Sequence, residues 1–145
     1  MGDAEASDSI SLSIGNDVAE LQRLNLAVHR FLSDRNVHGN AREMIDLTLE
    51  EVITNIIKYG HADNRPHAIA VSISLPAGEA VLRIEDDGHP FDPLAIPPLD
   101  TSQPLDERPV GGLGIHLIRK MAKAISYQRL DGGNRLEVRI NLQVD

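Results

Sequence analysis

Two polar residues near the middle of the chain, Glu51 and Asn55, have the types and the spacing of a small metal-assisted site. Apolar residues at helical spacing predict that both lie on one helix, where they stand about 40° apart at the edge of the apolar face; Glu50 lies about 140° from Asn55. An amide oxygen suits Mg²⁺, and a carboxylate one turn away could orient or deprotonate an attacking hydroxyl. Taken alone, the pair is more typical of a solvated helix flank than of a site, because such flanks are normally polar.

Asp86 is a second candidate, because it follows a predicted strand and stands two residues before Gly88. A carboxylate at a strand end, beside a flexible glycine, could accept a hydrogen bond from the exocyclic amine of adenine. The sequence HPFDP at residues 89–93 then fixes the chain as it leaves the strand. The alternative is an ordinary turn, since Asp and Gly dominate turns.

A third candidate is the glycine cluster Gly111, Gly112, Leu113 and Gly114, which precedes a predicted helix. Backbone N–H groups and the positive end of the helix dipole could face an anion there without an intervening side chain, and a triphosphate is the natural occupant. The alternative is a flexible turn at a helix start. The sequence has no Gly-x-x-x-x-Gly-Lys-Ser/Thr motif, and the cluster lacks the third glycine and the preceding strand of a dinucleotide fold.

Composition narrows the class of protein. A chain of 145 residues suits one domain, so we expect a single domain over residues 1–145 with residues 1–8 flexible. A net charge of −8 argues against nucleic acid and anionic lipid as partners. Cysteine is absent, the first residues are acidic and polar, and no apolar run approaches the ~20 residues that span a bilayer; we expect a cytoplasmic protein. None of the six histidines has a paired helical spacing, so we expect no histidine metal site.

The elements that must position these residues follow from hydrophobic periodicity. Alternation predicts half-buried strands, helical spacing predicts three amphipathic helices, and a proline-rich stretch over residues 93–110 predicts a mobile lid. The expected fold is an α/β (α+β) two-layer sandwich, with a mixed, mostly antiparallel sheet covered on one face by three helices. The expected order is strand 9–14, helix from 17 over four to five turns, helix 41–59, strands 69–75 and 81–85, lid, helix from 115 to about 124, and two strands that meet at residues 131–133.

In combination, the three motifs carry a resemblance to a known family. EVITN at residues 51–55, DDGHPFDP at 86–93 and GGLGIHLI at 111–118, in that order and with a lid between the last two, resemble the ATP-binding domain shared by gyrase, histidine kinases and mismatch-repair ATPases. The chain is similar, more closely still, to the stand-alone bacterial anti-sigma-factor serine-protein kinases. The resemblance covers the chain from the first helix to the final strand, and it implies a histidine-kinase-like ATPase fold.

The resemblance also implies a role for each matched position. Asn55 would bind Mg²⁺, Glu51 would act as the catalytic base or water-orienting carboxylate, and Asp86 would recognise adenine. Gly88 would allow the base to approach closely. The cofactors implied are ATP and Mg²⁺, and the full nucleotide-binding set is Asn55, Asp86, Gly88, Pro90, Gly111, Gly112, Leu113 and Gly114.

The partners implied are a STAS-type anti-anti-sigma protein, a sigma factor and a second copy of the chain in a homodimer. The first hypothesis is therefore a protein serine/threonine kinase that phosphorylates a STAS-type antagonist and sequesters a sigma factor. The alternative is a nucleotide-binding partner-switching module with little or no kinase activity, and a third possibility is a stress-signalling kinase that acts on a large multiprotein complex. His89-Pro90 departs from the small residue and glycine that are more frequent after the adenine motif in relatives.

Overall fold

The computed structural model describes residues 8–63, 65–95 and 113–142, and within them a five-stranded sheet carries three α-helices. The strand order is β1-β2-β3-β5-β4, and all four pairings are antiparallel. The predicted two-layer α+β sandwich is confirmed, with a more uniform sheet than the mixed one expected. In chain order the elements are β1 (Ser9–Gly15), α2 (Val18–Asp34), α3 (Gly39–Tyr59), β2 (Ala68–Ser74), β3 (Glu79–Asp86), the 3₁₀ turn η1 (Pro93–Ala95), α4 (Leu113–Met121), β4 (Ala124–Leu130) and β5 (Gly133–Asn141).

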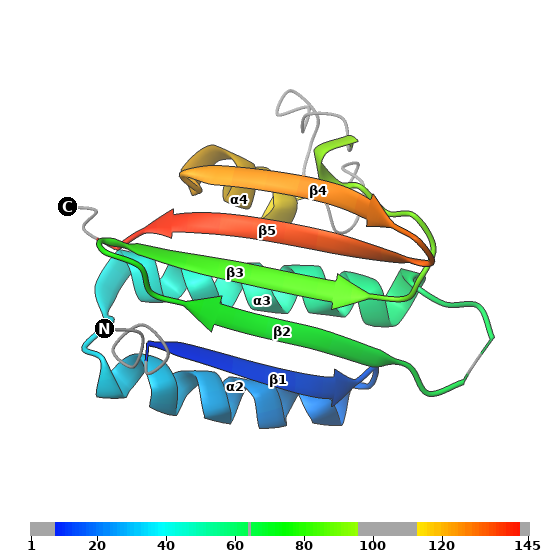
Figure 1. Cartoon of the computed structure of the whole chain (residues 1–145), viewed down its shortest axis with the longest axis horizontal. Helices are drawn as coiled ribbons and strands as arrows, with labels where there is room; N and C mark the ends of the chain where they lie inside the picture. The colour runs from blue at the N-terminus through cyan, green and yellow to red at the C-terminus, as the bar shows by residue number, and fades with distance from the viewer. Residues whose placement is uncertain (1–7, 64, 96–112, 143–145) are drawn as a thin grey trace.

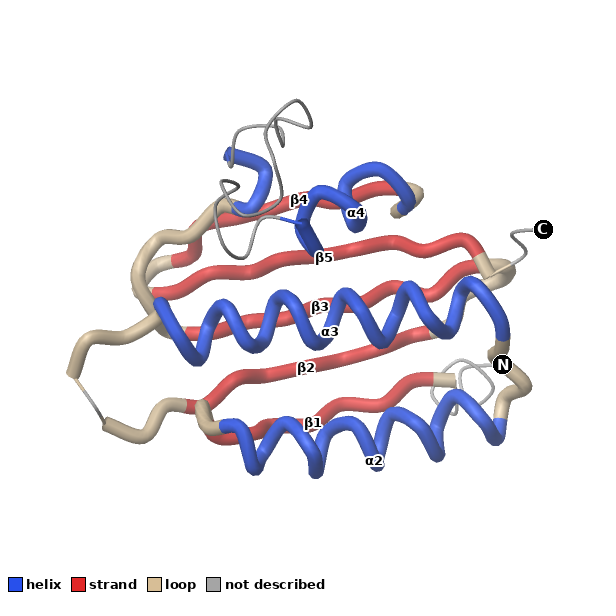
Figure 2. The backbone as a smooth tube through the Cα atoms, turned by 180° about the vertical axis from the view of Figure 1, so that it is seen from behind, coloured by secondary structure: helices blue, strands red, loops and turns tan. Residues whose placement is uncertain are grey.

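All three helices lie on the same face of the sheet (Figure 1). Figure 2, seen from behind, shows α2 along β1, α3 over the middle strands and α4 over β5 and β4. The long helix α3 contacts both α2 and α4, and it also contacts β5. Because α3 carries Glu51 and Asn55, the central position of this helix holds both residues against the sheet at the boundary with α4.

The core lies between the two layers and is built from alternating strand residues and one stripe of each helix. Ile69, Val71 and Ile73 of β2 are almost completely buried, as the period-two pattern predicts. Leu24 of α2 and Ile53 of α3 pack against them from the helical layer and are fully buried. Burying such side chains contributes about 1.5–3 kcal/mol each, so the sandwich is held mainly by this apolar layer.

The helix starts follow local capping chemistry. The Oδ1 atom of Asp17 accepts a hydrogen bond from the backbone N–H of Glu20 at 3.0 Å, which confirms the predicted start of α2. Helix α3 begins at Gly39, two residues before the predicted Ala41, with His38 at the N-cap position. It ends at Tyr59, as predicted.

Two expectations about the second half of the chain are wrong. The last helix ends at Met121 and not near Ala124, because the backbone N–H of Lys123 donates to the carbonyl oxygen of Arg139 at 2.8 Å and draws the chain into the sheet. Met121 is also 60% exposed, although its helical spacing predicts a buried side chain. Residues 93–95, at the start of the predicted lid, form a 3₁₀ turn; the rest of the lid lies outside the described residues and stays a prediction.

Candidate nucleotide-binding site

The carboxyl ends of α3 and β3 meet, and this contact brings two of the predicted motifs together. The backbone N–H of His89 donates to the carbonyl oxygen of Gly60 at 2.9 Å. A Cβ atom on Gly88 would lie 2.5 Å from that same oxygen, so a larger residue would push the two segments apart. Gly88 therefore lets the end of β3 dock against the end of the helix that carries Asn55.

A pocket lies between these segments and the start of α4, and both Asn55 and Asp86 line it. It encloses about 470 Å³ of empty space, part of it open to solvent. Most of its lining is apolar, as expected for a pocket that receives a flat organic ring. The lining residues are Val52, Asn55, Ile56, Tyr59, Gly60, Ile84, Asp86, His89, Phe91, Pro93, Ile115, Tyr127, Asn134 and Leu136.

The aromatic residues gather at this pocket. The chain has only two tyrosines and two phenylalanines, and Tyr59, Tyr127 and Phe91 all line the pocket, whereas Phe31 is buried in the core. Tyr59 is 58% exposed and Phe91 is 39% exposed, so both leave apolar surface open to a ligand. Aromatic faces prefer offset stacking on other rings, which suits a purine base.

Asn55 is a buried polar residue with its side chain free to bind. It is 9% exposed, and within the described part of the chain its amide makes no hydrogen bond. An amide oxygen is a ligand that Mg²⁺ accepts alongside water and phosphate oxygens. The residue therefore fits the predicted role of holding the metal of a nucleotide.

Asp86 presents one carboxylate oxygen to the protein and leaves the other open. Its Oδ2 atom accepts hydrogen bonds from the backbone N–H of Gly88 at 2.8 Å and from the Nδ2 atom of Asn134 at 3.2 Å. Among the described residues no donor reaches the Oδ1 atom. A carboxylate fixed through one oxygen has the arrangement needed to accept a hydrogen bond from a ligand amine with the other.

Glu51 lies beside the pocket and not in its lining, at the amino-terminal end of α4. A Cβ atom on Gly114 would lie 2.1 Å from the Cδ atom of Glu51, so the carboxylate packs directly against the glycine backbone. The positive end of a helix dipole stabilises a carboxylate placed in this way. Glu50, by contrast, is exposed and borders a separate surface hollow, as the helical angle predicts.

The remaining predicted site residues lie in different places relative to the pocket. Gly88 and Gly114 are buried near the pocket without lining it, and Pro90 is exposed on the outer side of the same loop. Leu113 is the first residue of α4. Gly111 and Gly112 lie outside the described residues, so the phosphate-binding role of the glycine cluster stays a prediction.

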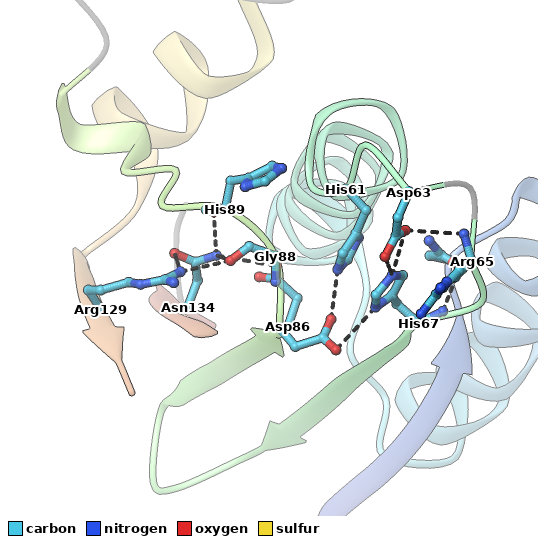
Figure 3. A network of polar contacts seen from close by, with 11 residues as sticks. His61, Asp63, Arg65, His67, Asp86, Gly88, His89, Arg129 and Asn134 are labelled. Atoms are coloured by element: carbon cyan, nitrogen blue, oxygen red, sulfur yellow. Dashed lines mark hydrogen bonds and ion pairs between the residues drawn. The ribbon is translucent and has the colours of Figure 1, made fainter. Parts of the chain in front are cut away.

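Asn134 is a site residue that the sequence did not reveal. It is 5% exposed, and its Nδ2 atom donates to the carbonyl oxygen of His89 at 2.8 Å as well as to Asp86. Its Oδ1 atom accepts a hydrogen bond from the Tyr127 hydroxyl. Figure 3 shows Asn134 between Arg129 and the Gly88-His89 backbone. The position follows a Gly-Gly turn, where Asn is common for local reasons, so no sequence signal distinguishes it.

A polar cluster of four side chains adjoins the pocket on the far side of Gly88. His61 and His67 both contact the carboxylate of Asp87. Asp63 contacts the other side of the His67 ring (Figure 3). Hydrogen bonds with Asp63 and then Asp87 raise the pKa of His67 above its ordinary value. The His67 and His61 rings in turn lower the pKa of Asp87. The cluster therefore favours charged carboxylates around the His67 ring.

Comparison with known proteins identifies the family. A family model described as the histidine kinase-like ATPase domain matches residues 14–140. The chain belongs to this family. The match runs from the end of β1 through all three helices to nearly the end of β5, so it covers most of the described fold. The family and the fold predicted from the sequence are confirmed.

One curated relative and one solved structure illustrate the similarity of this ATPase domain. It is 35% identical over 133 residues to the serine/threonine-protein kinase BtrW of Bordetella bronchiseptica, and the match covers 89% of each chain. A crystal structure of the RsbU and RsbW domains of Rv1364c from Mycobacterium tuberculosis is similar in fold, with a TM-score of 0.67 and 12% identity. That match covers 92% of this chain and 32% of the other.

No described helix is long and apolar enough to cross a membrane.

Proposed function

We propose that this chain is an ATP-dependent protein serine/threonine kinase that acts as an anti-sigma regulatory factor. The observation that carries the proposal is that Asn55 and Asp86, which lie far apart in the sequence, line one pocket together with three aromatic rings. The similarity to a protein named as a serine/threonine kinase, at 35% identity along 89% of both chains, supports the same activity. The proposed substrate is a serine or threonine of a STAS-type antagonist.

Asp86 and the aromatic residues would bind the base. The free Oδ1 atom of Asp86 accepts a hydrogen bond from the exocyclic amine of adenine. Tyr59 and Phe91 cover the adenine ring with their exposed faces. Asn134 holds Asp86 in place from behind, through its bond to Oδ2. The apolar lining of the pocket excludes water from the ring.

The chemistry would take place at the α3 and α4 end of the site. Asn55 would hold Mg²⁺ through its amide oxygen, and the bound ion neutralises phosphate charge. Glu51 orients the attacking hydroxyl and accepts its proton. The backbone N–H groups of Gly111, Gly112, Leu113 and Gly114 would hold phosphate oxygens at the start of α4. Most of the catalysis in such a site comes from positioning and electrostatic stabilisation, so few reactive side chains are needed.

The proposal includes the partners. We infer that the kinase sequesters a sigma factor until an unphosphorylated antagonist displaces it, and that the working form is a cytoplasmic homodimer. These inferences rest on the relationship to anti-sigma-factor kinases. Co-purification of the chain with a candidate sigma factor, with and without the antagonist, tests them directly.

Transfer of labelled phosphate from ATP·Mg²⁺ to a candidate STAS protein tests the catalytic proposal. Glu51→Gln should lower the transfer rate by about 10²–10⁴-fold, the usual contribution of a general base, while ATP still binds. Glu50→Gln is the matched control, because the neighbouring carboxylate is exposed and faces away, and it should leave the rate unchanged.

Asn55→Ala should abolish the dependence of ATP binding on Mg²⁺. If Glu51→Gln transfers phosphate at the wild-type rate, the proposed role of this carboxylate is wrong. If the chain binds ATP and the sigma factor but transfers no phosphate, the partner-switching module is the correct function. A chain that binds no ATP at all would overturn both.

A further inference from the structure

The cluster of His61, Asp63, His67 and Asp87 has the arrangement of a metal site. One nitrogen or oxygen atom from each of His61, His67 and Asp87 lies within 4.8 Å of the other two. The Nε2 atom of His61 is 2.7 Å from Oδ1 of Asp87, and the Nδ1 atom of His67 is 3.1 Å from Oδ2. The two imidazole rings stack with 3.5 Å between centroids. Two histidines therefore present nitrogens to the same small volume.

His67 has the second contact that metal-binding histidines usually make. Its Nδ1 atom faces the cluster, and its Nε2 atom is 2.9 Å from Oδ1 and 3.0 Å from Oδ2 of Asp63. Asp63 is itself fixed by the backbone N–H of Arg65 at 3.1 Å. A carboxylate behind a ligating histidine sets its tautomer and orients the ring toward the metal. The backbone N–H of His67 also donates to Oδ1 of Asn16 at 3.0 Å, which anchors this end of the loop.

His61 contributes independent evidence. Its side chain is only 9% exposed, and its Nδ1 atom is buried without a hydrogen-bond partner among the described residues. In an ordinary surface ion pair the histidine would be solvated, and both ring nitrogens would have partners. Because stacked rings hold their nitrogen lone pairs in parallel planes, the His61 ring must turn to direct a nitrogen at an ion that His67 and Asp87 bind, and its Nδ1 atom has no hydrogen bond among the described residues to lose in that turn.

We propose that His61, His67 and Asp87 bind a divalent transition-metal ion of the zinc class, with Asp63 as the supporting carboxylate. Two imidazole nitrogens and one carboxylate oxygen form a donor set that Zn²⁺ accepts readily, whereas Mg²⁺ and Ca²⁺ prefer oxygen ligands throughout. This site is separate from the proposed Mg²⁺ position at Asn55 and does not depend on nucleotide binding. The ligands come from three segments, so a search for paired spacing on one helix could not detect them.

The position of the site gives the metal a structural role. His61 directly follows Gly60 at the end of α3, and Asp87 directly precedes Gly88 at the end of β3. A metal bound to both would join the two segments whose contact forms one wall of the pocket. It would also fix the loop between α3 and β2, because His67 lies just before β2.

Titration of the chelator-treated full chain with ZnCl₂, without nucleotide, tests the proposal. Calorimetry should give one site per chain, and Co²⁺ in place of Zn²⁺ should give the visible absorption of a low-symmetry nitrogen and oxygen site. His67→Gln and Asp87→Asn should each remove this binding. Asp63→Asn should weaken it by about 10- to 100-fold, as expected for a supporting carboxylate. MgCl₂ should not compete.

His38→Gln is the control, since this exposed histidine precedes α3 at its opposite end. It should bind Zn²⁺ like the wild type. Circular dichroism confirms that each variant is folded, and a loss of binding shared by the folded His67→Gln and Asp87→Asn chains supports the site. The proposal is wrong if the folded wild-type chain binds no stoichiometric zinc, or if the His61→Gln/His67→Gln double variant binds it with unchanged affinity.

Discussion

Replacing Asp86 by asparagine isolates the proposed recognition of adenine, because the change removes one charge and keeps the shape of the side chain. Two donors already face the Oδ2 position, namely the backbone N–H of Gly88 at 2.8 Å and the amide of Asn134 at 3.2 Å. The new amide should therefore keep its oxygen on that side. Its NH₂ group would then occupy the Oδ1 position and face the exocyclic amine of adenine, so two donors would oppose each other.

The loss of ATP affinity can be worked out from the hydrogen bond that Asp86→Asn removes. A hydrogen bond to a charged group is worth about 1.5–3 kcal/mol, and each 1.4 kcal/mol changes an affinity about tenfold. We expect the dissociation constant for ATP·Mg²⁺ to rise by about 10- to 150-fold. The free energy of unfolding should change by less than about 1 kcal/mol, because the contacts to Gly88 and Asn134 are kept.

Calorimetric titration of Asp86→Asn with ATP and with ITP measures the loss of nucleotide affinity and shows whether the exocyclic amine causes it. ITP has a carbonyl oxygen in place of the exocyclic amine, so the wild-type carboxylate should repel it. The amide of the variant can donate to that oxygen. The preference for ATP over ITP should therefore shrink or reverse in Asp86→Asn.

Either of two results would refute this reasoning about Asp86. The first is an unchanged affinity for ATP, which would mean that no base contacts the carboxylate. The second is an equal loss of affinity for ATP and ITP in a folded variant, which would mean that Asp86 shapes the pocket without contacting the amine.

Three further perturbations test other parts of the molecule. Gly114→Ala places a Cβ atom 2.1 Å from Cδ of Glu51; because the end of this side chain can turn away, we expect a change of less than about 1 kcal/mol in urea unfolding but slower phosphotransfer. Asn134→Ala leaves several buried polar groups unpaired and should cost about 2–4 kcal/mol of unfolding free energy, with weaker ATP binding. Hydrogen bonds from Arg23 and from the backbone of the preceding strand lower the pKa of Glu20 from 4.5 to about 2. Because this pKa is lower in the folded state, its contribution to stability is present above pH 4.5 and is lost as the pH falls to about 2. The stabilities of the wild type and Glu20→Gln should therefore converge at low pH.

Each of these perturbations has a control in the chain. Gly15→Ala places a Cβ atom at an ordinary 3.5 Å from the Glu20 side chain and should be tolerated. Asn25→Ala and Glu43→Gln change exposed residues of α2 and α3 and should leave stability nearly unchanged. A carboxyl NMR titration that finds an ordinary pKa for Glu20 would contradict the pH prediction. Gly114→Ala with wild-type phosphotransfer would show that the position of Glu51 beside Gly114 is not needed.

The sequence determined the elements of this protein well, because they follow from local physics. Alternating apolar residues specified four of the five strands, and helical spacing specified the three helices and placed Asn55 and Glu51 on one stripe. The Asp17 cap was visible as a carboxylate three residues before the backbone N–H of Glu20, which donates to it. The family was recognisable as well, because its three motifs are continuous stretches of sequence.

The end of α4 was not predictable in this way. Residues after Met121 have acceptable helix propensity, and the chain leaves the helix because pairing with β5 satisfies its backbone instead. Contacts between distant segments overrule local preference here, and the spacing of residues within one segment does not report them.

Only the tertiary structure decided which polar side chains contact one another. Asn134 bonds to Asp86 across 48 positions of sequence, and His61 meets Asp87 across 26. Residue spacing predicts neither pairing, because the partners belong to different elements. The energy of such a contact depends on burial and on the atoms that face each other, and both are set only when the helical layer closes over the sheet.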